Sequence, residues 1–535
     1  MSLVTLTSYP AAWALLLLPF LYIIATWALA GRRPKNYPPG PPPVLGLGNI
    51  LQIPPEHAFL KFHEWKQTFG DIIGLKVGSQ NMVVLQSAEH VKELIEKRGS
   101  IYSDRPQPYI TAKLINPGTI ISLNNDHTIK RARTAMRYMF SPAEVPRVLA
   151  LQTALGAMLL REILDDPGGF RTHMKRWALA TPLAIVSGQE VGETGPSSTE
   201  AYFGTQKRWL RFLTPTTAPP VEIFPALKHL PGFLARWRRE ALELKGDMFR
   251  MMYHMLDGAQ AQHASSAKGL RGGKHESVMS RLIRDGETAE DLRFGDHELA
   301  LFGSGTLDAA VDTIIATTSS VMLVFGAFPE VQKRVQAEVD AIWLDDVPTP
   351  EKLGQAKFLR AVLTETTRWR PAAPTAVPRV LSRDDTYRDY SFSKGTMFII
   401  NAWSIHMDEE WYDRPEEFRP ERYLDNKWGV RPGKKAAAEK QNRHATYGFG
   451  VGRRMCPGLD YAENQVMITM AKMAWEFDVV AKGELECGIE KAFHSDLVLA
   501  PKAFDVGFVP RSEGRKNKLV EDDEEARKVF ATWVQ

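Results

Sequence analysis

The residues with the clearest chemical potential lie between 447 and 458, in the stretch YGFGVGRRMCPG. The stretch holds Cys456, one of two cysteines in a chain of 535 residues, so a disulfide would need Cys487 as its partner. Two cysteines make a poor disulfide framework for a chain of this length. The neighbouring glycines instead favour a thiolate that ligates a metal, because they let the backbone approach a flat ligand and turn amide groups toward the sulfur.

Two other chemistries can be compared with metal ligation. A phosphate-binding loop needs the pattern G-x-G-x-x-G, and after Gly450 and Gly452 the third glycine is replaced by Met455. A nucleophilic cysteine needs a base such as a histidine beside it, which one sequence does not place. The phosphate loop is therefore disfavoured, and the nucleophile stays open as an alternative.

Five residues of the stretch fit the pattern F-x-x-G-x-R-x-C-x-G, namely Phe449, Gly452, Arg454, Cys456 and Gly458. This pattern resembles the haem-binding loop of the cytochrome P-450 monooxygenases, and the resemblance runs from the N-terminal apolar segment to about residue 510. It implies that Cys456 is the axial thiolate ligand of haem b, whose electron donation favours O–O cleavage. It also implies that Phe449, Gly450 and Gly458 belong to the cofactor-binding loop.

Two further segments agree with this resemblance. Glu365 and Arg368 in LTETTRWRP are three residues apart, which places both side chains on one face of a helix. The segment FRPERY, residues 418–423, resembles the second arginine segment of the family. By resemblance, Glu365, Arg368 and Arg422 form a buried triad that supports the haem loop, and a buried charge set must be fully paired.

The oxygen-activating segment is the least regular match. The stretch AAVDTI, residues 309–314, falls where the family has A-G-x-D-T-T, so the resemblance gives Asp312 and Thr313 as the acid and the alcohol beside bound oxygen. Ala310 and Ile314 depart from that pattern, which puts in question how far the helix opens beside the iron. Asp308, in GTLD, is a rival acid, and the spacing to Pro329 favours Asp312.

The haem propionates require cationic partners, and arginine suits carboxylates through its fork of donors. The segment HTIKR resembles the family's W-x-x-x-R, which gives Arg131 as a candidate and His127 as a weaker one. By position in the family, Arg379 and Arg454 are the other two candidates. We expect at least two of these residues to contact the cofactor.

The elements that must position these residues begin with an apolar segment at 10–30, which contains no charged residue. At about 1.5 Å per residue it is long enough to cross roughly 30 Å of hydrocarbon. The first charges follow it, at Arg32, Arg33 and Lys35, which argues against a cleaved signal peptide and puts the rest of the chain in the cytosol. We expect a single-pass anchor in the endoplasmic reticulum membrane; a signal peptide and a buried helix are the alternatives.

The rest of the chain reads as mainly helical with a small β region, and the resemblance implies the cytochrome P-450 fold behind one transmembrane helix. Strands are expected within 71–87, a helix from Pro329, and a loop at 258–277. The expected organisation is a lumenal N-terminus at 1–9, the anchor at 10–30, a proline-rich hinge at 31–50, a haem-binding catalytic domain at 51–512, and a charged tail at 513–535 that is solvated or disordered.

Charge and resemblance together define the expected function. Net charge is only +4 and no long basic tract is present, so nucleic-acid binding is excluded. The resemblance implies a monooxygenase that takes electrons from NADPH–cytochrome P-450 reductase and inserts one atom of dioxygen into a hydrophobic small molecule, as fungal secondary-metabolite enzymes do. A reductase-independent haem-thiolate isomerase or dehydratase and a non-catalytic membrane haem protein are the alternatives. Basic residues near the haem loop, Lys434, Lys435, Arg443 and Arg453, are candidates for docking the acidic reductase.

Overall fold

The computed structural model describes residues 31–119, 124, 126–214, 217–269, 274–495 and 497–534. The predicted anchor at 10–30 lies outside the described residues. Within the described part, one helix is long and apolar enough to cross a membrane, α11 (Asp296–Ala327), and 61% of its most apolar window is buried inside the protein. That helix is the central core helix, so its hydropathy reflects burial in the fold.

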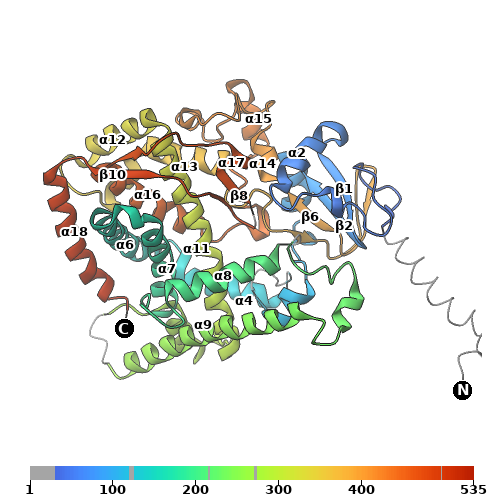
Figure 1. Ribbon diagram of the computed structural model, residues 1–535, viewed down its shortest axis with the longest axis horizontal. Helices are drawn as coiled ribbons and strands as arrows, with labels where there is room; N and C mark the ends of the chain where they lie inside the picture. Colours follow the sequence, from blue (N-terminus) through green and yellow to red (C-terminus); the bar gives the residue numbers. More distant parts are fainter. Residues whose placement is uncertain are drawn as a thin grey trace, which may run out of the picture.

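Helices form most of the molecule, and they surround α11 on several sides (Figure 1). The longer helices besides α11 are α2 (Ala58–Phe69), α4 (His127–Ala135), α6 (Val145–Asp165), α7 (Phe170–Ser187), α8 (Thr199–Leu213), α9 (Arg236–Ala267), α10 (Val278–Gly286), α12 (Pro329–Trp343), α13 (Lys357–Trp369), α16 (Leu459–Glu476) and α18 (Glu513–Ala531). The short ones are α3 (Ala88–His90), α5 (Arg137–Phe140), α14 (Ala402–His406), α15 (Lys435–Lys440) and α17 (Ile489–Ala492). The predicted helix from Pro329 is α12.

A small β region lies at the end of the molecule opposite α18 (Figure 1). Its four-stranded sheet has the order β1-β2-β6-β3. The two strands predicted within 71–87 are β1 and β2, which pair antiparallel with Ile72 opposite Leu85. The strands of this sheet are β1 (Ile72–Val77), β2 (Gln80–Leu85), β6 (Met397–Ile400) and β3 (Arg379–Val380). The smaller pairs are β4 (Asp385–Tyr387) with β5 (Tyr390–Phe392), β7 (Phe477–Ala481) with β10 (Val506–Pro510), and β8 (Phe493–Ser495) with β9 (Leu499–Pro501).

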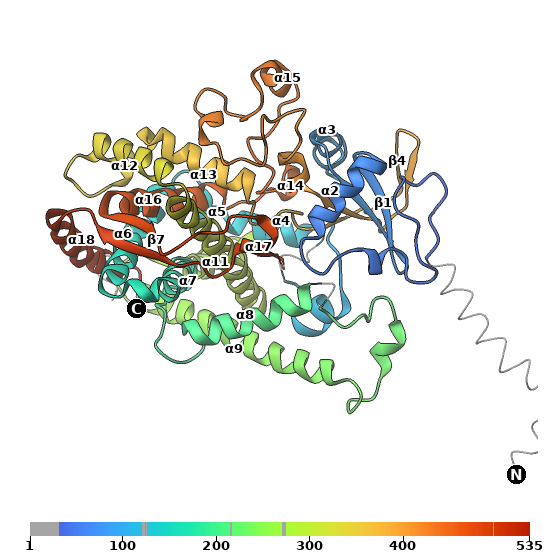
Figure 2. The ribbon, with the colours of Figure 1, turned by 45° about the horizontal axis from the view of Figure 1, so that its top comes forward.

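The helix α11 is apolar on most of its circumference, and twenty of its 32 residues are buried. Such a sequence can be stable only where other elements cover it on every side. In Figure 2 the pair α8 and α9 passes on one side of α11, and α12, α13 and α16 lie on the other. The helix therefore passes through the body of the protein and carries its side chains toward two different surroundings.

The C-terminal segment differs from the sequence-based expectation. Residues 513–535 were expected to be solvated or disordered because of their charge, whereas the described part of the segment forms α18, which packs against α6 and α16. Apolar residues hidden among the charges explain this: Leu519 and Trp533 are each 1% exposed, and Lys472 of α16 pairs with Asp522. The expected loop at 258–277 is also partly helical, since α9 continues to Ala267.

Candidate functional site

The loop that carries Cys456 is held in a defined conformation by glycines and backbone hydrogen bonds. Gly452 has a φ of +62°, and a Cβ atom there would lie 2.9 Å from the carbonyl oxygen of Ile95, so only glycine fits. The Cys456 amide donates a hydrogen bond of 2.9 Å to the carbonyl oxygen of Phe449. The loop thereby turns back on itself and presents Cys456 at its tip.

The tip of the loop faces a cavity of about 300 Å³ that separates it from α11. Cys456, Phe449, Gly450 and Gly458 line one part of the wall, and Ala309, Ala310 and Thr313 of α11 line another. The structure thus brings the predicted cysteine loop and the predicted alcohol of α11 to one cavity. The two groups lie on elements that are far apart in the sequence, and folding brings them to the same cavity.

Local electrostatics decide the state of the thiol. Burial raises the pKa of the Cys456 thiol above its ordinary value, while a hydrogen bond from the Gly458 amide and the charge of Arg133 act in the opposite direction. A metal ion binds the thiolate and therefore supplies the stabilisation that burial withholds. The surroundings fit a cysteine that is ionised when a cation is bound.

Four arginines converge on the same cavity: Arg105, Arg133, Arg379 and Arg454. Burial, together with the charges of Arg454 and Arg133, lowers the pKa of Arg379 to about 9. The pKa of Arg454 falls to about 10 through burial and the neighbouring Arg133. A buried group of like charges needs an anion to balance it.

The hydrogen bonds of Arg379 and Arg105 leave donors for such an anion. Arg379 donates to the carbonyl oxygen of Val451, and its other terminal nitrogen has no hydrogen-bond partner among the described residues. Arg105 donates to the carbonyl oxygens of Val377 and Pro378, both at 2.6 Å. Backbone carbonyls carry no net charge, so these hydrogen bonds do not neutralise the guanidinium groups of Arg379 and Arg105. A flat ligand with two carboxylates and a metal centre, such as haem, fits this donor set.

Arg131 lies elsewhere, in contrast to the sequence-based expectation. Its guanidinium stacks on the ring of Phe294 at 4.6 Å and approaches Glu298 at 3.4 Å. His127 is exposed at the start of α4. On the same helix, two residues further on, Arg133 reaches the cavity. Two residues apart on a helix, Arg131 and Arg133 point to different faces, and of the two Arg133 lines the cavity.

Sequence reasoning also missed Arg105 and Arg133. Arg105 belongs to the segment YSDRP, whose arginine is followed by a proline that disfavours helix. Arg133 follows Arg131 in the series of basic residues on α4. In both cases the arginine enters an otherwise apolar environment only after the chain folds. A local sequence pattern does not reveal this.

The predicted acids lie on a different face of α11 from Thr313. The Thr313 hydroxyl donates hydrogen bonds to the carbonyl oxygens of Ala309 and Ala310, at 2.9 and 3.2 Å. Burial raises the pKa of Asp312 to about 6, and the charge of Lys175 acts in the opposite direction. Asp308 lines a second cavity, between α8, α9 and α11. Asp312 and Asp308 are therefore half-buried carboxyls whose surroundings favour the protonated form.

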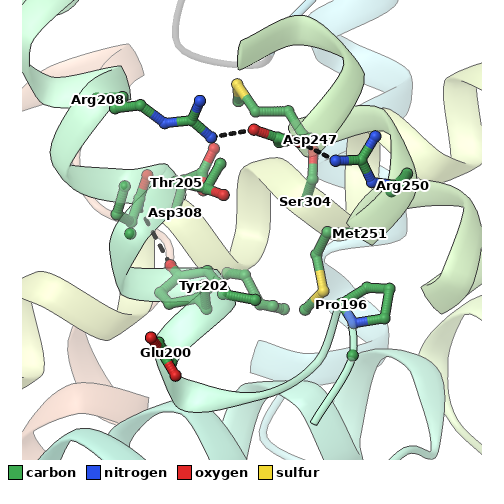
Figure 3. A pocket seen from close by; sticks show the side chains of 16 residues that line it. Pro196, Glu200, Tyr202, Thr205, Arg208, Asp247, Arg250, Met251, Ser304 and Asp308 are labelled. Atoms are coloured by element: carbon green, nitrogen blue, oxygen red, sulfur yellow. Dashed lines mark hydrogen bonds and ion pairs between the residues drawn. The ribbon is translucent and has the colours of Figure 1, made fainter. Parts of the chain in front are cut away.

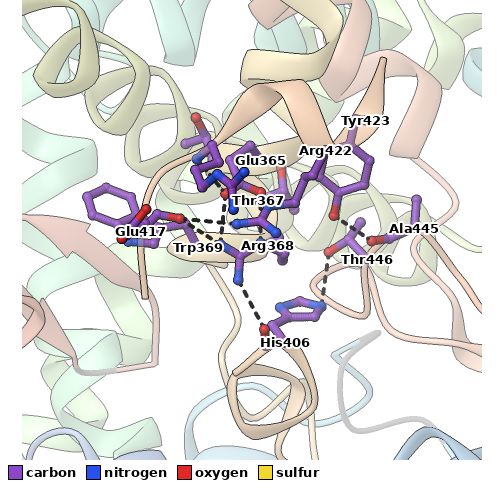
Figure 4. Close-up of polar contacts among 12 residues, drawn as sticks. Glu365, Thr367, Arg368, Trp369, His406, Glu417, Arg422, Tyr423, Ala445 and Thr446 are labelled. Atoms are coloured by element: carbon purple, nitrogen blue, oxygen red, sulfur yellow. Dashed lines mark hydrogen bonds and ion pairs between the residues drawn. The ribbon is translucent and has the colours of Figure 1, made fainter. Parts of the chain in front are cut away.

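The expected charge triad is assembled and buried (Figure 4). Arg368 donates to Glu365 at 2.7 and 2.8 Å, and both side chains are fully buried. Arg422 donates to the same carboxylate at 3.0 Å. The Arg419 amide adds a further hydrogen bond of 2.9 Å to Glu365. The carboxylate is thus surrounded by donors, which a buried charge requires.

Comparison with known proteins identifies what the site resembles. The family model described as Cytochrome P450 matches residues 38–508. A cytochrome P450 monooxygenase of Arthrobotrys oligospora is 31% identical over 95% of each chain, and one of a Penicillium species is 31% identical over 91% of this chain and 90% of its own. Among solved structures, a zebrafish cytochrome P450 determined with progesterone covers 85% of this chain and 99% of its own, with a TM-score of 0.69 and 20% identity, which indicates a shared fold.

Proposed function

This chain belongs to the cytochrome P450 family, and we propose that it is a membrane-anchored haem-thiolate monooxygenase that inserts one atom of dioxygen into a hydrophobic small molecule. The observation that supports the proposal most directly is the shared cavity. One wall carries Cys456, a second carries Thr313, and the arginines gather at its edge. A metal ligand, a proton-handling alcohol and anion-binding groups thereby meet around a single space.

Haem b would be held in this cavity by the residues described above. Cys456 would ligate the iron through its thiolate, and Arg105, Arg133, Arg379 and Arg454 would bind the propionates through charge-assisted hydrogen bonds. The loop residues Phe449, Gly450 and Gly458 line the cysteine side. When bound, the haem supplies the redox chemistry that activates dioxygen.

The Thr313 hydroxyl would hold a water molecule on the α11 side of the cavity. Its proton is used in the hydrogen bonds to the helix backbone, so the oxygen lone pairs are left to accept from water. Asp312, the next residue back along the helix, would supply protons to that water by general acid catalysis, and its raised pKa of about 6 suits the task near neutral pH.

The substrate class follows from the apolar part of the wall. Ala372, Ala373, Ala376, Val377 and Ile314 line the cavity with hydrocarbon. A hydrophobic scaffold of the kind found in fungal secondary metabolism would gain free energy by leaving water for this wall. The fungal origin of the relatives supports that class.

Four exposed apolar side chains, the apolar patch, support the proposal of membrane association. Phe233 and Leu234, on the connection between α8 and α9, are 85% and 60% exposed, and Leu45 and Leu51 of the hinge are 63% and 73% exposed. The Gly78 amide, in the turn between β1 and β2, donates to the carbonyl oxygen of Leu47 in the hinge, and a Cβ atom at Gly78 would lie 3.5 Å from Ile223 of the connection. That turn therefore lies between the two segments. We propose that this patch rests on the cytosolic face of the endoplasmic reticulum membrane, with residues 10–30 spanning it.

NADPH–cytochrome P-450 reductase would dock on the face of the cysteine loop. Arg453 and Lys435 are exposed there. Arg443 is not available for docking, because it is 6% exposed and stacks on Trp411 at 4.0 Å. We therefore assign Arg443 a structural role in support of the loop. The docking proposal rests on the exposed cations Arg453 and Lys435.

The decisive experiment is co-expression with the reductase in a host supplied with candidate terpenoid, polyketide and alkaloid scaffolds. Mass spectrometry should show a product heavier by about one oxygen atom only when reductase and NADPH are present. A product of unchanged or dehydrated mass without reductase would identify the isomerase or dehydratase alternative. Haem binding without any product across the scaffolds would favour the non-catalytic haem protein.

A further inference from the structure

We propose that Asp308 and Asp312 act in series as a proton inlet, which carries protons from the cavity beside α8 and α9 through α11 to the Thr313 side of the haem cavity. The inference rests on the proposed monooxygenase function and adds Asp308 as a positioning residue that acts through Asp312. The two acids, which the sequence presents as rivals for one role, would have two successive roles.

The inlet begins at the second cavity, which has a volume of about 560 Å³ and is half open to solvent (Figure 3). Asp308, Ser304 and Leu307 of α11 form its inner wall, and Tyr202 and Gln206 of α8 lie nearby. In Figure 3 the side chain of Asp308 lies beside that of Thr205, at the inner side of the cavity. Water from the surface can therefore reach the carboxyl of Asp308.

Helix geometry places Asp312 between the two cavities. An α-helix turns about 100° per residue, so Asp312 lies about 40° around the axis from Asp308, and Thr313 lies about 100° beyond Asp312. Asp308 lines the second cavity, whereas Thr313 lines the haem cavity. Asp312 thus occupies the intermediate direction, one turn above Asp308 and next to Thr313 in the chain. No other acid of α11 has this placement, since Asp296 and Glu298 are in its first turn.

The charges around the two acids fit proton carriers better than ion pairs. Among the described residues, neither carboxyl has a hydrogen-bond or ion-pair partner within the distances that define one, and neither has an oxygen sealed away from solvent. Burial and the neighbouring Asp312 raise the pKa of Asp308 to about 7. Burial raises the pKa of Asp312 to about 6, against the charge of Lys175 on α7. The facing Tyr202 on α8 stays neutral, because burial and the two acids raise its pKa.

Three other charged residues of the cavity already form ion pairs with one another. Asp247 of α9 is paired with both Arg208 of α8 and Arg250 of α9, which close the outer rim (Figure 3). Those cations are therefore engaged and do not neutralise Asp308. Glu200, at the start of α8, also lines the cavity and is exposed. It therefore serves as a control acid that belongs to the same cavity but not to α11.

The proton balance of the inlet closes at each turnover. Asp312 gives its proton to the water held by Thr313 and becomes a carboxylate. That carboxylate takes the proton of Asp308 through an intervening water, and the Asp308 carboxylate is reprotonated from the water of the open cavity. Both acids end as they began, and the only net change is one proton moved from solvent to the haem cavity.

The test compares Asp308→Asn, Asp308→Glu, Asp312→Asn and the double Asn variant with Glu200→Gln as control. The full-length holoenzyme is assayed with reductase and NADPH on the scaffold that the wild type oxidises. Asp308→Asn should lower product per NADPH consumed by about tenfold or more while the carbon monoxide spectrum is kept, and Asp308→Glu should restore it. The double variant should be no worse than Asp312→Asn alone, because two steps in series are not additive.

Infrared difference titration of the same holoenzyme gives a readout that does not depend on turnover. The C=O band of a protonated carboxylic acid should disappear in Asp308→Asn, and in Asp312→Asn the titration of the remaining Asp308 should shift to lower pH, because its like-charged neighbour is gone. Glu200→Gln should leave both the band and the coupling unchanged.

Three results would overturn the inference: wild-type coupling in Asp308→Asn, an equal loss in Glu200→Gln, or additive losses in the double variant. Failure of the proposed function is distinct from these, because it would appear as absence of reductase-dependent product in the wild type. In that case the infrared titration alone decides whether the two acids are coupled.

Discussion

Arg368 of the buried triad donates a hydrogen bond of 3.0 Å to the backbone carbonyl of His406. The ring of the same histidine accepts a hydrogen bond of 2.8 Å from the Tyr447 amide, at the start of the cysteine loop. Burial and the charge of Arg368 lower the pKa of His406 to about 3, so the ring stays neutral and its Nε2 atom can accept. The triad and the loop are therefore joined through one residue (Figure 4).

This connection predicts that Glu365→Gln destabilises the protein and releases the loop. Two buried guanidinium groups would lose their common carboxylate, and an uncompensated buried charge costs about 3–5 kcal/mol. Thermal unfolding should shift to a lower midpoint, and the purified protein should contain less haem. Glu421→Gln is the matched control, because Glu421 lies in the same segment and pairs with Arg334 at the surface. An exposed pair contributes at most about 1 kcal/mol, so a comparable loss in the control would contradict a special role for Glu365.

The ligand assignment predicts opposite results for the two cysteines. Cys456→Ala should abolish the red-shifted Soret band that thiolate-ligated haem shows when reduced and bound to carbon monoxide. Cys487→Ala should keep it, because Cys487 lies against a separate cluster of apolar residues around Phe493 and Phe504. Difference spectroscopy of the two purified variants measures both outcomes. A normal band in Cys456→Ala would show that another residue ligates the iron.

The arginine cluster predicts different behaviour for Arg379 and Arg131. Arg379→Ala should weaken haem retention, because it removes a buried guanidinium that lines the cavity and has a donor free for a carboxylate. Arg131→Ala should leave haem retention near the wild-type level, since its partners are Phe294 and Glu298. The rate of haem transfer to apomyoglobin reports retention in both variants. Faster loss from Arg131→Ala than from Arg379→Ala would restore the sequence-based assignment.

The contrast between these two arginines shows what sequence could and could not predict. The cysteine loop and the triad segments are local motifs that resemble those of the family, so Cys456, Glu365 and Arg368 could be named in advance. The arginines that line the cavity come from four separate segments, and only folding decides which arginine of α4 points into it. The packing of α18 could likewise not be predicted from its charged sequence, because its buried residues are few and widely spaced among acids and lysines.

The buried carboxyl of Glu476 predicts a pH dependence of stability at the α18 interface. Both of its oxygens lack hydrogen-bond partners among the described residues, and burial raises its pKa from 4.5 to about 7. The native state then holds the proton that the unfolded chain releases, so stability is full below about pH 4.5 and falls as the pH rises toward 7. Glu476→Gln should remove this loss, and its melting temperature should exceed that of the wild type at pH 8 more than at pH 5. An equal difference at both pH values would show that Glu476 is not the titrating group.

The last prediction concerns the hydroxyl of Thr313, where the sequence departs most from the family pattern. Thr313→Val keeps the shape of the side chain and removes the hydroxyl that is proposed to hold water at this point of the cavity wall. Haem spectrum and substrate binding should be kept, whereas product per NADPH consumed should fall by about a hundredfold, with peroxide released instead, because a positioned proton donor contributes about that much. Thr313→Ser should retain most of the coupling, since the hydroxyl remains. Thr306→Val serves as control: Thr306 lies about two turns before Thr313 on α11 and lines the same cavity, and its hydroxyl donates to the carbonyl oxygen of Phe302. If Thr313→Val stayed fully coupled, another group or a hydroxyl of the substrate would have to hold the water. The departures at Ala310 and Ile314 would then indicate a helix that relies on its substrate for this function.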